Sequence, residues 1–180
     1  MKMNLSFKPA LLLLEIILLI VAAISCERHS SVVPAQDSDC ITAQDLANLK
    51  LILAADEGNL EKMKAMMESG ADVNVSDDLF GTPVVAAVNS GKSDAIKLLL
   101  DKGASVDGKD PAGCTALIMA TLTDNADVVR LLVSKGADVN ASCYPLVYGK
   151  RGSKFTPLIV AKARKNQPII KLLTDAGAKE

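Results

Sequence analysis

The chain has 180 residues, a formal net charge of −1 at pH 7, four cysteines and one histidine. A nearly neutral charge argues against a nucleic-acid-binding protein, which needs a basic face. With His29 as the one histidine and no Cys-x-x-Cys pair or Cys/His cluster in the sequence, a zinc site is not expected. The length suits one modest domain that buries a core of its own.

Residues 1–25 have the pattern of a signal peptide. A basic start precedes an apolar run over residues 10–25, interrupted by Glu15 and shorter than the ~20 residues that a membrane-spanning helix normally uses. The run ends in Ala23-Ile24-Ser25-Cys26, which resembles the lipobox of bacterial lipoproteins. The resemblance implies lipidation of Cys26 and a membrane-anchored protein of the bacterial cell envelope, facing the periplasm or the cell exterior. An ordinary cleaved signal and an uncleaved anchor helix are the alternatives.

Residues 26–41 link this leader to the rest of the chain. They show no hydrophobic period, contain Pro34, and are mostly small or polar. Such a composition is typical of an extended linker, so we predict a flexible tether between the membrane and the domain that follows.

From residue 42 onward the chain repeats itself. A Gly-Ala pair followed by a polar turn occurs at residues 70–74, 103–107 and 136–140, one 33-residue period apart. A fourth pair, Gly177-Ala178, follows 41 residues after the third, so the last unit carries eight extra residues. A fixed period of this size indicates stacked structural units, which usually present a binding surface.

The segments upstream of the glycines agree as well. Thr82-Pro83-Val84-Val85 aligns with Thr115-Ala116-Leu117-Ile118 and with Thr156-Pro157-Leu158-Ile159, whereas Leu49 takes the place of the threonine in the first unit. Together with the apolar pairs of the second helices, these motifs resemble the ankyrin repeat, whose pattern runs turn, Thr-Pro-Leu-His, short helix, Gly turn, and a second helix ending in Leu-Leu and Gly-Ala. The resemblance covers residues 42–180.

The resemblance implies an all-α repeat solenoid, an ankyrin stack of four helix-turn-helix repeats joined by hairpin turns. The expected repeats are residues 42–76, 77–109, 110–142 and 143–180, the last with an insertion over residues 143–154. The first repeat, which no hairpin precedes, is expected to be an N-terminal capping unit.

Several repeated residues have a physical role in such units. We expect the four Gly-Ala glycines to end helices in a left-handed conformation, and Thr82, Thr115 and Thr156 to cap the first helices. The histidine of the family pattern is replaced by apolar residues, so packing takes over from its hydrogen bonds. We ascribe the recurring Asp72, Asp107 and Asp138 to the preference of turns for such residues. The apolar replacements of the histidine are Ile52, Val85, Ile118 and Ile159.

The charge is unevenly distributed along the repeats. Residues 37–78 hold ten acidic side chains and three lysines, a formal charge of −7, whereas residues 143–180 hold eight Lys or Arg and two acids, a charge of +6. The array is therefore expected to be acidic at one end and basic at the other. Such polarity is typical of a solvated surface, and it would also steer a dipolar partner or favour end-to-end association.

If Cys26 is lipidated, three cysteines remain, and three cannot all pair within one chain. Cys40 lies in the tether, Cys114 in a hairpin and Cys143 at the start of the insertion. Neighbouring repeats are spaced by about 10 Å, which exceeds the ~4.4 to 6.8 Å between the Cα atoms of a disulfide. This spacing argues against a bond between Cys114 and Cys143, although an oxidising envelope leaves the pairing open.

The repeats offer no catalytic constellation. They contain no histidine, their carboxylates lie at turn positions, and no glycine-rich phosphate motif is present. We therefore predict that the protein is not an enzyme, has no catalytic residues, and needs no cofactor, metal or small-molecule substrate. Two functions remain: an envelope adaptor that binds one protein partner through hairpin tips and concave face, and an immunity or inhibitor protein that occludes a periplasmic toxin or enzyme.

The aromatic residues mark the predicted binding site. After the signal, the chain contains four, and all of them fall in turns or in the insertion. Tyrosine beside arginine or lysine is typical of the energetic centres of interfaces. The alternative is that these aromatics only hold the hairpins and the loop in place, with the partner bound instead on the concave helices around Asn89, Ser90, Leu122 and Thr123. The predicted partner-binding residues are Phe80, Tyr144, Tyr148, Lys150, Arg151 and Lys154.

Overall fold

A computed structural model describes residues 42–144, 146–147 and 150–179, and for residues 146, 147, 150 and 151 it describes the backbone alone. The predicted signal peptide, the lipidation site Cys26, the tether and the candidate Tyr148 lie outside the described residues. Among those that are described, no helix is long and apolar enough to cross a membrane.

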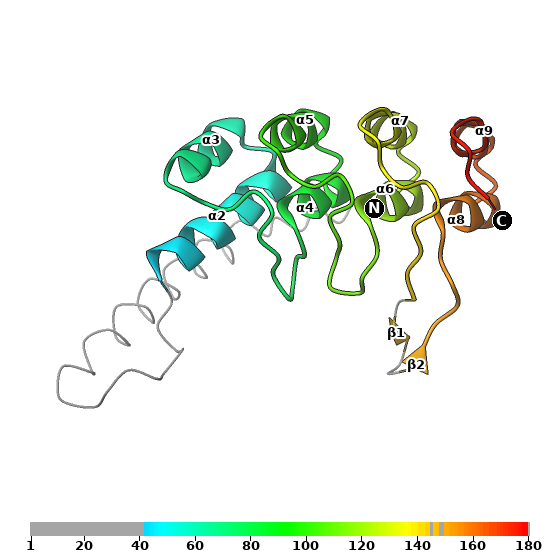
Figure 1. The fold of residues 1–180 in the computed structure, drawn as a ribbon, viewed down its shortest axis with the longest axis horizontal. Helices are drawn as coiled ribbons and strands as arrows, with labels where there is room; N and C mark the ends of the chain where they lie inside the picture. Colours follow the sequence, from blue (N-terminus) through cyan, green and yellow to red (C-terminus); the bar gives the residue numbers. More distant parts are fainter. Residues whose placement is uncertain (1–41, 145, 148–149, 180) are drawn as a thin grey trace, which may run out of the picture. The chain divides into compact units, whose positions relative to one another are not determined.

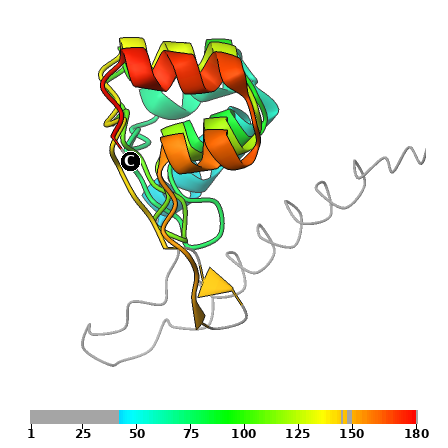
Figure 2. The same cartoon turned by 90° about the vertical axis from the view of Figure 1, so that its right-hand side faces the viewer.

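Eight helices in the described residues form four pairs, and the pairs stack side by side (Figure 1). The first helices contact one another in the order α4, α6, α8, and the second helices pack as α3 on α5 and α7 on α9. Seen from the end of the stack, the two rows form two layers, and the hairpins run away from both (Figure 2). The prediction of a helical repeat stack is therefore confirmed. The pairs are α2 (Ala43–Glu57) with α3 (Leu60–Glu68), α4 (Pro83–Asn89) with α5 (Ser93–Asp101), α6 (Ala116–Leu122) with α7 (Ala126–Ser134), and α8 (Pro157–Ala163) with α9 (Gln167–Asp175).

The first helices depend on their neighbours for stability. The helices α4, α6 and α8 have seven residues each, far below the length at which an isolated helix is stable in water. Ala87, Ala120 and Ala161 are fully buried at equivalent positions, and their small side chains let successive helices approach closely. The core consequently runs through the whole stack, and no single pair contains it.

The first pair differs from the prediction. Helix α2 has 15 residues, and Leu49 lies in its interior, whereas the alignment placed Leu49 at the helix start. The helix begins at Ala43, six residues before the position at which the threonine precedes the other first helices.

The helix ends follow the repeated glycines. Gly70, Gly103, Gly136 and Gly177 have φ angles of 90°, 90°, 87° and 87°, which confirms the predicted left-handed conformation. The turn between the two helices of a pair contains a left-handed glycine in the first two pairs, Gly58 and Gly91. In the third pair the left-handed residue is Asp124, with a φ of 54°. There the Asp124 carboxylate accepts hydrogen bonds from Arg164 Nε at 2.7 Å and Asn166 Nδ2 at 3.1 Å, which ties the third pair to the fourth.

The exposed ion pair between Asp124 and Arg164 shifts the pKa values of both side chains. Hydrogen bonding from Arg164 and then from Asn166 lowers the pKa of Asp124, and the Asp124 carboxylate raises the pKa of Arg164. A lowered carboxyl pKa stabilises the fold above the ordinary pKa of aspartate, and this contribution is lost as the pH falls through the lowered value.

A ladder of side chains connects the loops after the second helices. Three of its bonds join neighbouring units, because a side-chain oxygen in one loop accepts the backbone N–H of the residue two positions beyond the glycine of the next unit's loop. In the first unit, Asn48 of α2 accepts the equivalent N–H within its own unit. Asp107 lies in its turn as predicted, and its carboxylate also accepts a hydrogen bond from the next unit. Asp72 and Asp138 do act within their turns, accepting from Asn74 N at 2.8 Å and Asn140 N at 2.9 Å. The ladder bonds are Asp72 N to Asn48 Oδ1 at 2.8 Å, Ser105 N to Asn74 Oδ1 at 2.7 Å, Asp138 N to Asp107 Oδ1 at 3.0 Å and Lys179 N to Asn140 Oδ1 at 2.7 Å.

The threonine caps are confirmed at one of three positions. Thr156 Oγ1 accepts the Ile159 N–H at 3.2 Å. Thr82 and Thr115 occupy the N-cap positions of α4 and α6 but make no side-chain cap bond, and both hydroxyl oxygens are buried without a hydrogen-bond partner in the described part of the chain. The residues three positions later are Val85 and Ile118, so the polar histidine of the family pattern is absent there.

We therefore expect Thr115→Val and Thr156→Val to change the free energy of unfolding by different amounts. Thr115→Val removes a buried hydroxyl that has no partner among the described residues, which should leave the free energy of unfolding within about 0.5 kcal/mol or raise it. Thr156→Val removes a working cap and should cost about 0.5 to 2 kcal/mol. Urea unfolding of the two variants measures both values, and equal losses would contradict the assignment of the caps.

Candidate protein-binding surface

The turns between helix pairs form a row of hairpins on one side of the stack (Figure 1). In each hairpin, one isolated antiparallel β-bridge joins the two arms. The bridged pairs are Asp77 with Gly81, Lys109 with Thr115, and Cys143 with Phe155. Phe80 belongs to the first of these hairpins, and Tyr144 and Lys154 flank the bridge of the third.

The 77–81 hairpin presents two apolar side chains to solvent. Leu79 is 79 % exposed and Phe80 39 %. The Asp77 carboxylate holds the turn, accepting from Leu79 N at 2.7 Å and Phe80 N at 3.1 Å, and Gly81 N donates to Asp77 O at 2.9 Å. The backbone is thus fixed while both side chains stay in water, which lowers the conformational entropy that binding would cost.

Leu79 was missed by the sequence analysis, which considered aromatic residues alone. The available signal was its place between Asp77-Asp78 and Gly81, since a large apolar residue in the middle of a tight turn has no core to enter. The candidate Phe80 is exposed beside it.

The insertion contains a strand pair that was not predicted. Strand β1 (Leu146–Val147) pairs antiparallel with β2 (Lys150–Arg151), with Leu146 opposite Arg151 and Val147 opposite Lys150. At its base, Cys143 N donates to Phe155 O at 3.0 Å and Phe155 N to Cys143 O at 2.9 Å.

The structure brings some of the candidate residues together. Tyr144, 40 % exposed, follows Cys143 at the base of the insertion, and the exposed Lys154 precedes Phe155 on the returning segment. The backbones of Lys150 and Arg151 form β2. Phe80 lies apart from these residues, on the 77–81 hairpin.

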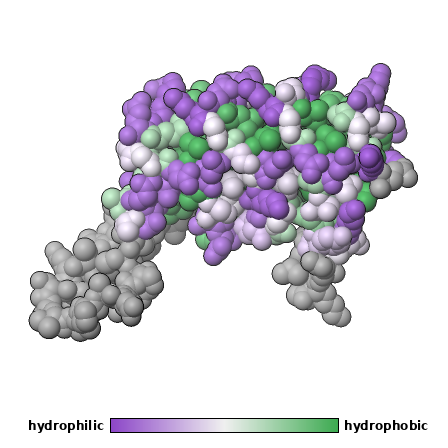
Figure 3. Space-filling model, in the orientation of Figure 1, coloured by the Kyte–Doolittle hydropathy of each residue, from purple (hydrophilic) through white to green (hydrophobic). Residues whose placement is uncertain are grey.

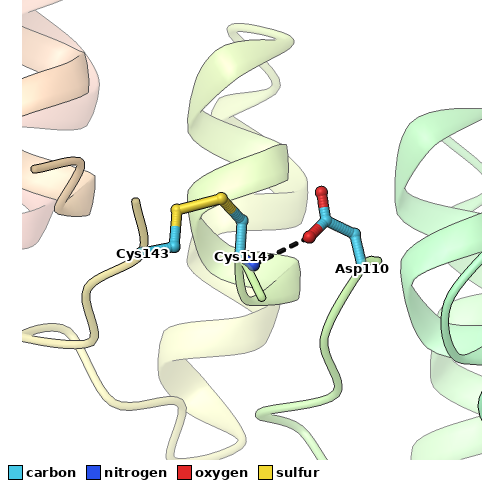
Figure 4. The surroundings of a disulfide bond; sticks show 3 residues. All are labelled: Asp110, Cys114 and Cys143. Carbon is cyan, nitrogen blue, oxygen red and sulfur yellow. Dashed lines mark hydrogen bonds between the residues drawn. A yellow bond between two sulfur atoms is a disulfide. The ribbon is translucent and has the colours of Figure 1, made fainter. Parts of the chain in front are cut away.

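Cys114 and Cys143 form a disulfide, with 4.9 Å between their Cα atoms (Figure 4). The spacing argument against this bond was wrong. It used the distance between helices, but the hairpins approach one another as neighbouring strands do, to about 4.8 Å. The preceding pair of hairpins shows the same approach, because Thr82 N donates to Lys109 O at 3.2 Å.

The disulfide lies in a small apolar cluster of its own. Cys114 and Cys143 are 3 % and 4 % exposed and pack with Ile118 and Val160. On the other side of the hairpin, Asp110 Oδ1 accepts the Cys114 N–H at 2.7 Å (Figure 4). Cys114 is therefore held by its own hairpin and by the bond to the next.

Two other surfaces of the stack differ from the hairpin row. On the first helices, Asn89 is exposed, but Ser90 donates to Asp56 and the Thr123 hydroxyl donates within its own helix, to Met119 O at 3.2 Å. On the second helices, α3, α5, α7 and α9, Figure 3 shows apolar residues between hydrophilic ones. A shallow groove of about 370 Å³ lies there between α3 and α5, lined by Lys64, Met67, Glu68, Ala71, Val73, Leu98 and Lys102.

The described residues contain no group of three or more His, Cys, Asp or Glu side chains that could hold a metal ion.

No curated protein is similar enough to the chain to count as a relative. A family model of ankyrin repeats, in three copies, matches residues 51–143, which is more than half of the chain. Such repeats generally mediate protein–protein interaction and typically carry no enzymatic activity. The chain belongs to the ankyrin repeat family.

Proposed function

We propose that the chain is a lipid-anchored protein-binding module of the bacterial cell envelope, which binds one protein partner through its hairpin tips, its insertion and its concave face. The observation that carries the proposal is the exposure of large apolar side chains on the hairpin row. Membrane attachment through Cys26 and a position facing the periplasm or the cell exterior belong to the proposal.

The exposed apolar residues support a protein partner. Within the described ranges, the large hydrophobic side chains that are exposed are Leu79, Phe80, Tyr144 and Ile159. Three of these four lie on the hairpin row, and buried apolar anchors of this kind carry most of the binding energy in protein interfaces. Lys154 adds a cation near Tyr144, which suits a partner with an acidic surface at that end.

The fourth helix pair supports a fourth repeat beyond the three in the family match. Its first helix has Thr156 as N-cap and begins at Pro157, and its second ends at Asp175, two residues before Gly177, whose φ is 87°. It also continues the ladder, because Lys179 N donates to Asn140 Oδ1. A binding surface that includes the insertion then belongs to the repeat array itself.

The leader and the disulfide support the location. The apolar run that ends in Ala23-Ile24-Ser25-Cys26 favours export and lipidation. A buried disulfide such as Cys114–Cys143 is typical of proteins in oxidising compartments, the bacterial periplasm among them.

An inhibitor or immunity protein is the second candidate. The 77–81 hairpin favours an inhibitor, because its hydrogen-bonded turn presents the exposed Leu79, which could enter and block an apolar cleft of an enzyme or toxin. The two functions differ in what binding does: an inhibitor abolishes the activity of its partner, whereas an adaptor leaves that activity unchanged.

Replacing Cys26 by serine tests the anchor. We expect the wild-type chain in the membrane fraction, and Cys26→Ser in the soluble fraction or retained with an uncut leader, because the multiple acyl chains of a lipoprotein hold firmly where one chain would bind marginally. Cell fractionation with mass spectrometry measures location and mass. A variant with unchanged mass in the membrane would contradict lipidation and favour the anchor helix.

Capture of the partner tests the binding surface. The wild-type chain should recover one partner protein from membranes. We expect the recovered amount of this protein to fall at least tenfold when the insertion is shortened to the standard 33-residue repeat, or with Tyr144→Ala. Lys64→Ala in the groove between α3 and α5 serves as the matched control and should recover the protein unchanged. Equal recovery by all variants would move the site away from the insertion.

A further inference from the structure

The insertion is anchored differently from the two hairpins before it. The 77–81 and 109–115 hairpins are each ordered by an aspartate carboxylate, Asp77 or Asp110, that accepts backbone N–H groups of its own turn. The residue one 33-residue period further on is Cys143. A disulfide-bonded cysteine offers no carboxylate, so this source of order is missing at the insertion.

The backbone pairing that the structure describes within the insertion is one short strand pair and one bridge. Strands β1 and β2 have two residues each, and an isolated pair of that size is marginal at best in water. At the base, the two backbone bonds between Cys143 and Phe155 form a single bridge. The covalent bond from Cys143 to Cys114 therefore lies where the carboxylate acts in the other hairpins.

We propose that the Cys114–Cys143 disulfide is the positioning element of the insertion, so that partner binding requires this cysteine pair to be oxidised. Tyr144 directly follows Cys143, and fixing Cys143 against the 109–115 hairpin fixes the backbone from which Tyr144 projects. The inference rests on the proposed function, since it assumes that the insertion contacts the partner.

The chemistry is thiol–disulfide exchange with an oxidant protein that carries a disulfide. The two thiols lose two electrons and two protons and form the S–S bond, while the oxidant's S–S bond is reduced to two thiols. With 3 % and 4 % exposure of the two cysteines, the finished bond is shielded from attack by other thiols. The binding surface is then completed in the oxidising compartment, and a chain still in the reducing cytosol binds its partner weakly.

Hydrogen exchange on the full chain tests the positioning. In Cys114→Ala/Cys143→Ala, and in wild type reduced with a dithiol under mild urea, we expect the backbone amides of residues 144–155 to exchange at least tenfold faster than in oxidised wild type. The 77–81 hairpin is the internal control and should change far less, because Asp77 orders it. Leu99→Ala, a core change in α5, controls for general loss of stability and should raise exchange throughout the stack.

Two results would overturn the inference. One is unchanged exchange over residues 144–155 when the disulfide is absent. The other is an increase over residues 144–155 that exceeds the increase in the 77–81 hairpin by no more than it does in Leu99→Ala, which would make the bond a general staple of the stack.

Binding to the captured partner separates this inference from the proposed function. We expect oxidised wild type to bind at least tenfold more tightly than Cys114→Ala/Cys143→Ala, and the chain with the shortened insertion to bind weakly in both redox states. If the shortened chain binds as wild type does, the proposed surface is wrong even though the exchange result stands. If shortening abolishes binding but removing the disulfide does not change it, the surface is right and the positioning role is wrong.

Discussion

Replacing Gly81 by alanine is expected to cost about 2 to 5 kcal/mol of unfolding free energy, from backbone strain and overpacking together. A Cβ atom at this position would lie 2.5 Å from the carbonyl oxygen of Lys109 and 2.7 Å from the Cα of Asp110, and the residue has a φ of 72°. The obstructing atoms belong to the backbone of the next hairpin, so a side-chain rotation cannot relieve the clash.

Gly103→Ala is the matched control for this prediction. Gly103 has a φ of 90°, but nothing lies within 4 Å of an added Cβ, so only the left-handed conformation opposes the change. We expect a cost of about 1 to 2 kcal/mol. Urea melts of both variants give the comparison, and a Gly81→Ala loss no larger than that of Gly103→Ala would show that the hairpins are not in close contact.

Removing the disulfide is expected to have the second large effect. With a sequence separation of 29 residues between the two cysteines, the chain-entropy model assigns the bond about 3 to 4 kcal/mol. Cys114→Ala/Cys143→Ala should lower the free energy of unfolding by this amount, and reduced wild type should unfold at the same urea concentration as the variant. Alanine is chosen because it places no polar group in the cluster with Ile118 and Val160.

An unfolding midpoint that is the same for oxidised wild type and the double variant would contradict this prediction. Because a thiol at Cys40 could form bonds between chains, Cys40→Ala is the appropriate background for all of these measurements.

The sequence was sufficient for the helix pairs because their signals are local. The glycines at 33-residue intervals end helices in a conformation that other residues adopt at a cost, and Pro83 and Pro157 occupy the first helical positions of α4 and α8. Thr115 and Thr156 share a sequence motif, yet only Thr156 forms its cap bond, and its φ of −120° differs from the −75° of Thr115.

Features that depend on contacts between units were harder to predict. The disulfide was disfavoured because helix spacing was applied to hairpins, and the ladder role of Asp107 requires a partner 31 positions away. Strands β1 and β2 have too few residues for an alternating pattern to be recognised.

The candidate site was predictable in part. Aromatic residues in turns indicated Phe80 and Tyr144, and both are exposed on the hairpin row. Leu79, the most exposed large apolar residue in the described part of the chain, was overlooked because aromatic composition was used as the criterion. Whether these residues contact a partner stays a prediction.

The most direct test of the protein-binding account is the dissociation constant of the captured partner for wild type and for Leu79→Ser/Phe80→Ser. Both side chains are exposed, so the double change should leave the unfolding midpoint nearly unchanged. The account predicts at least a tenfold weaker complex, with Lys64→Ala/Lys102→Ala in the outer groove binding as wild type does. Wild-type affinity in the hairpin variant, together with weakened binding in the groove variant, would contradict it.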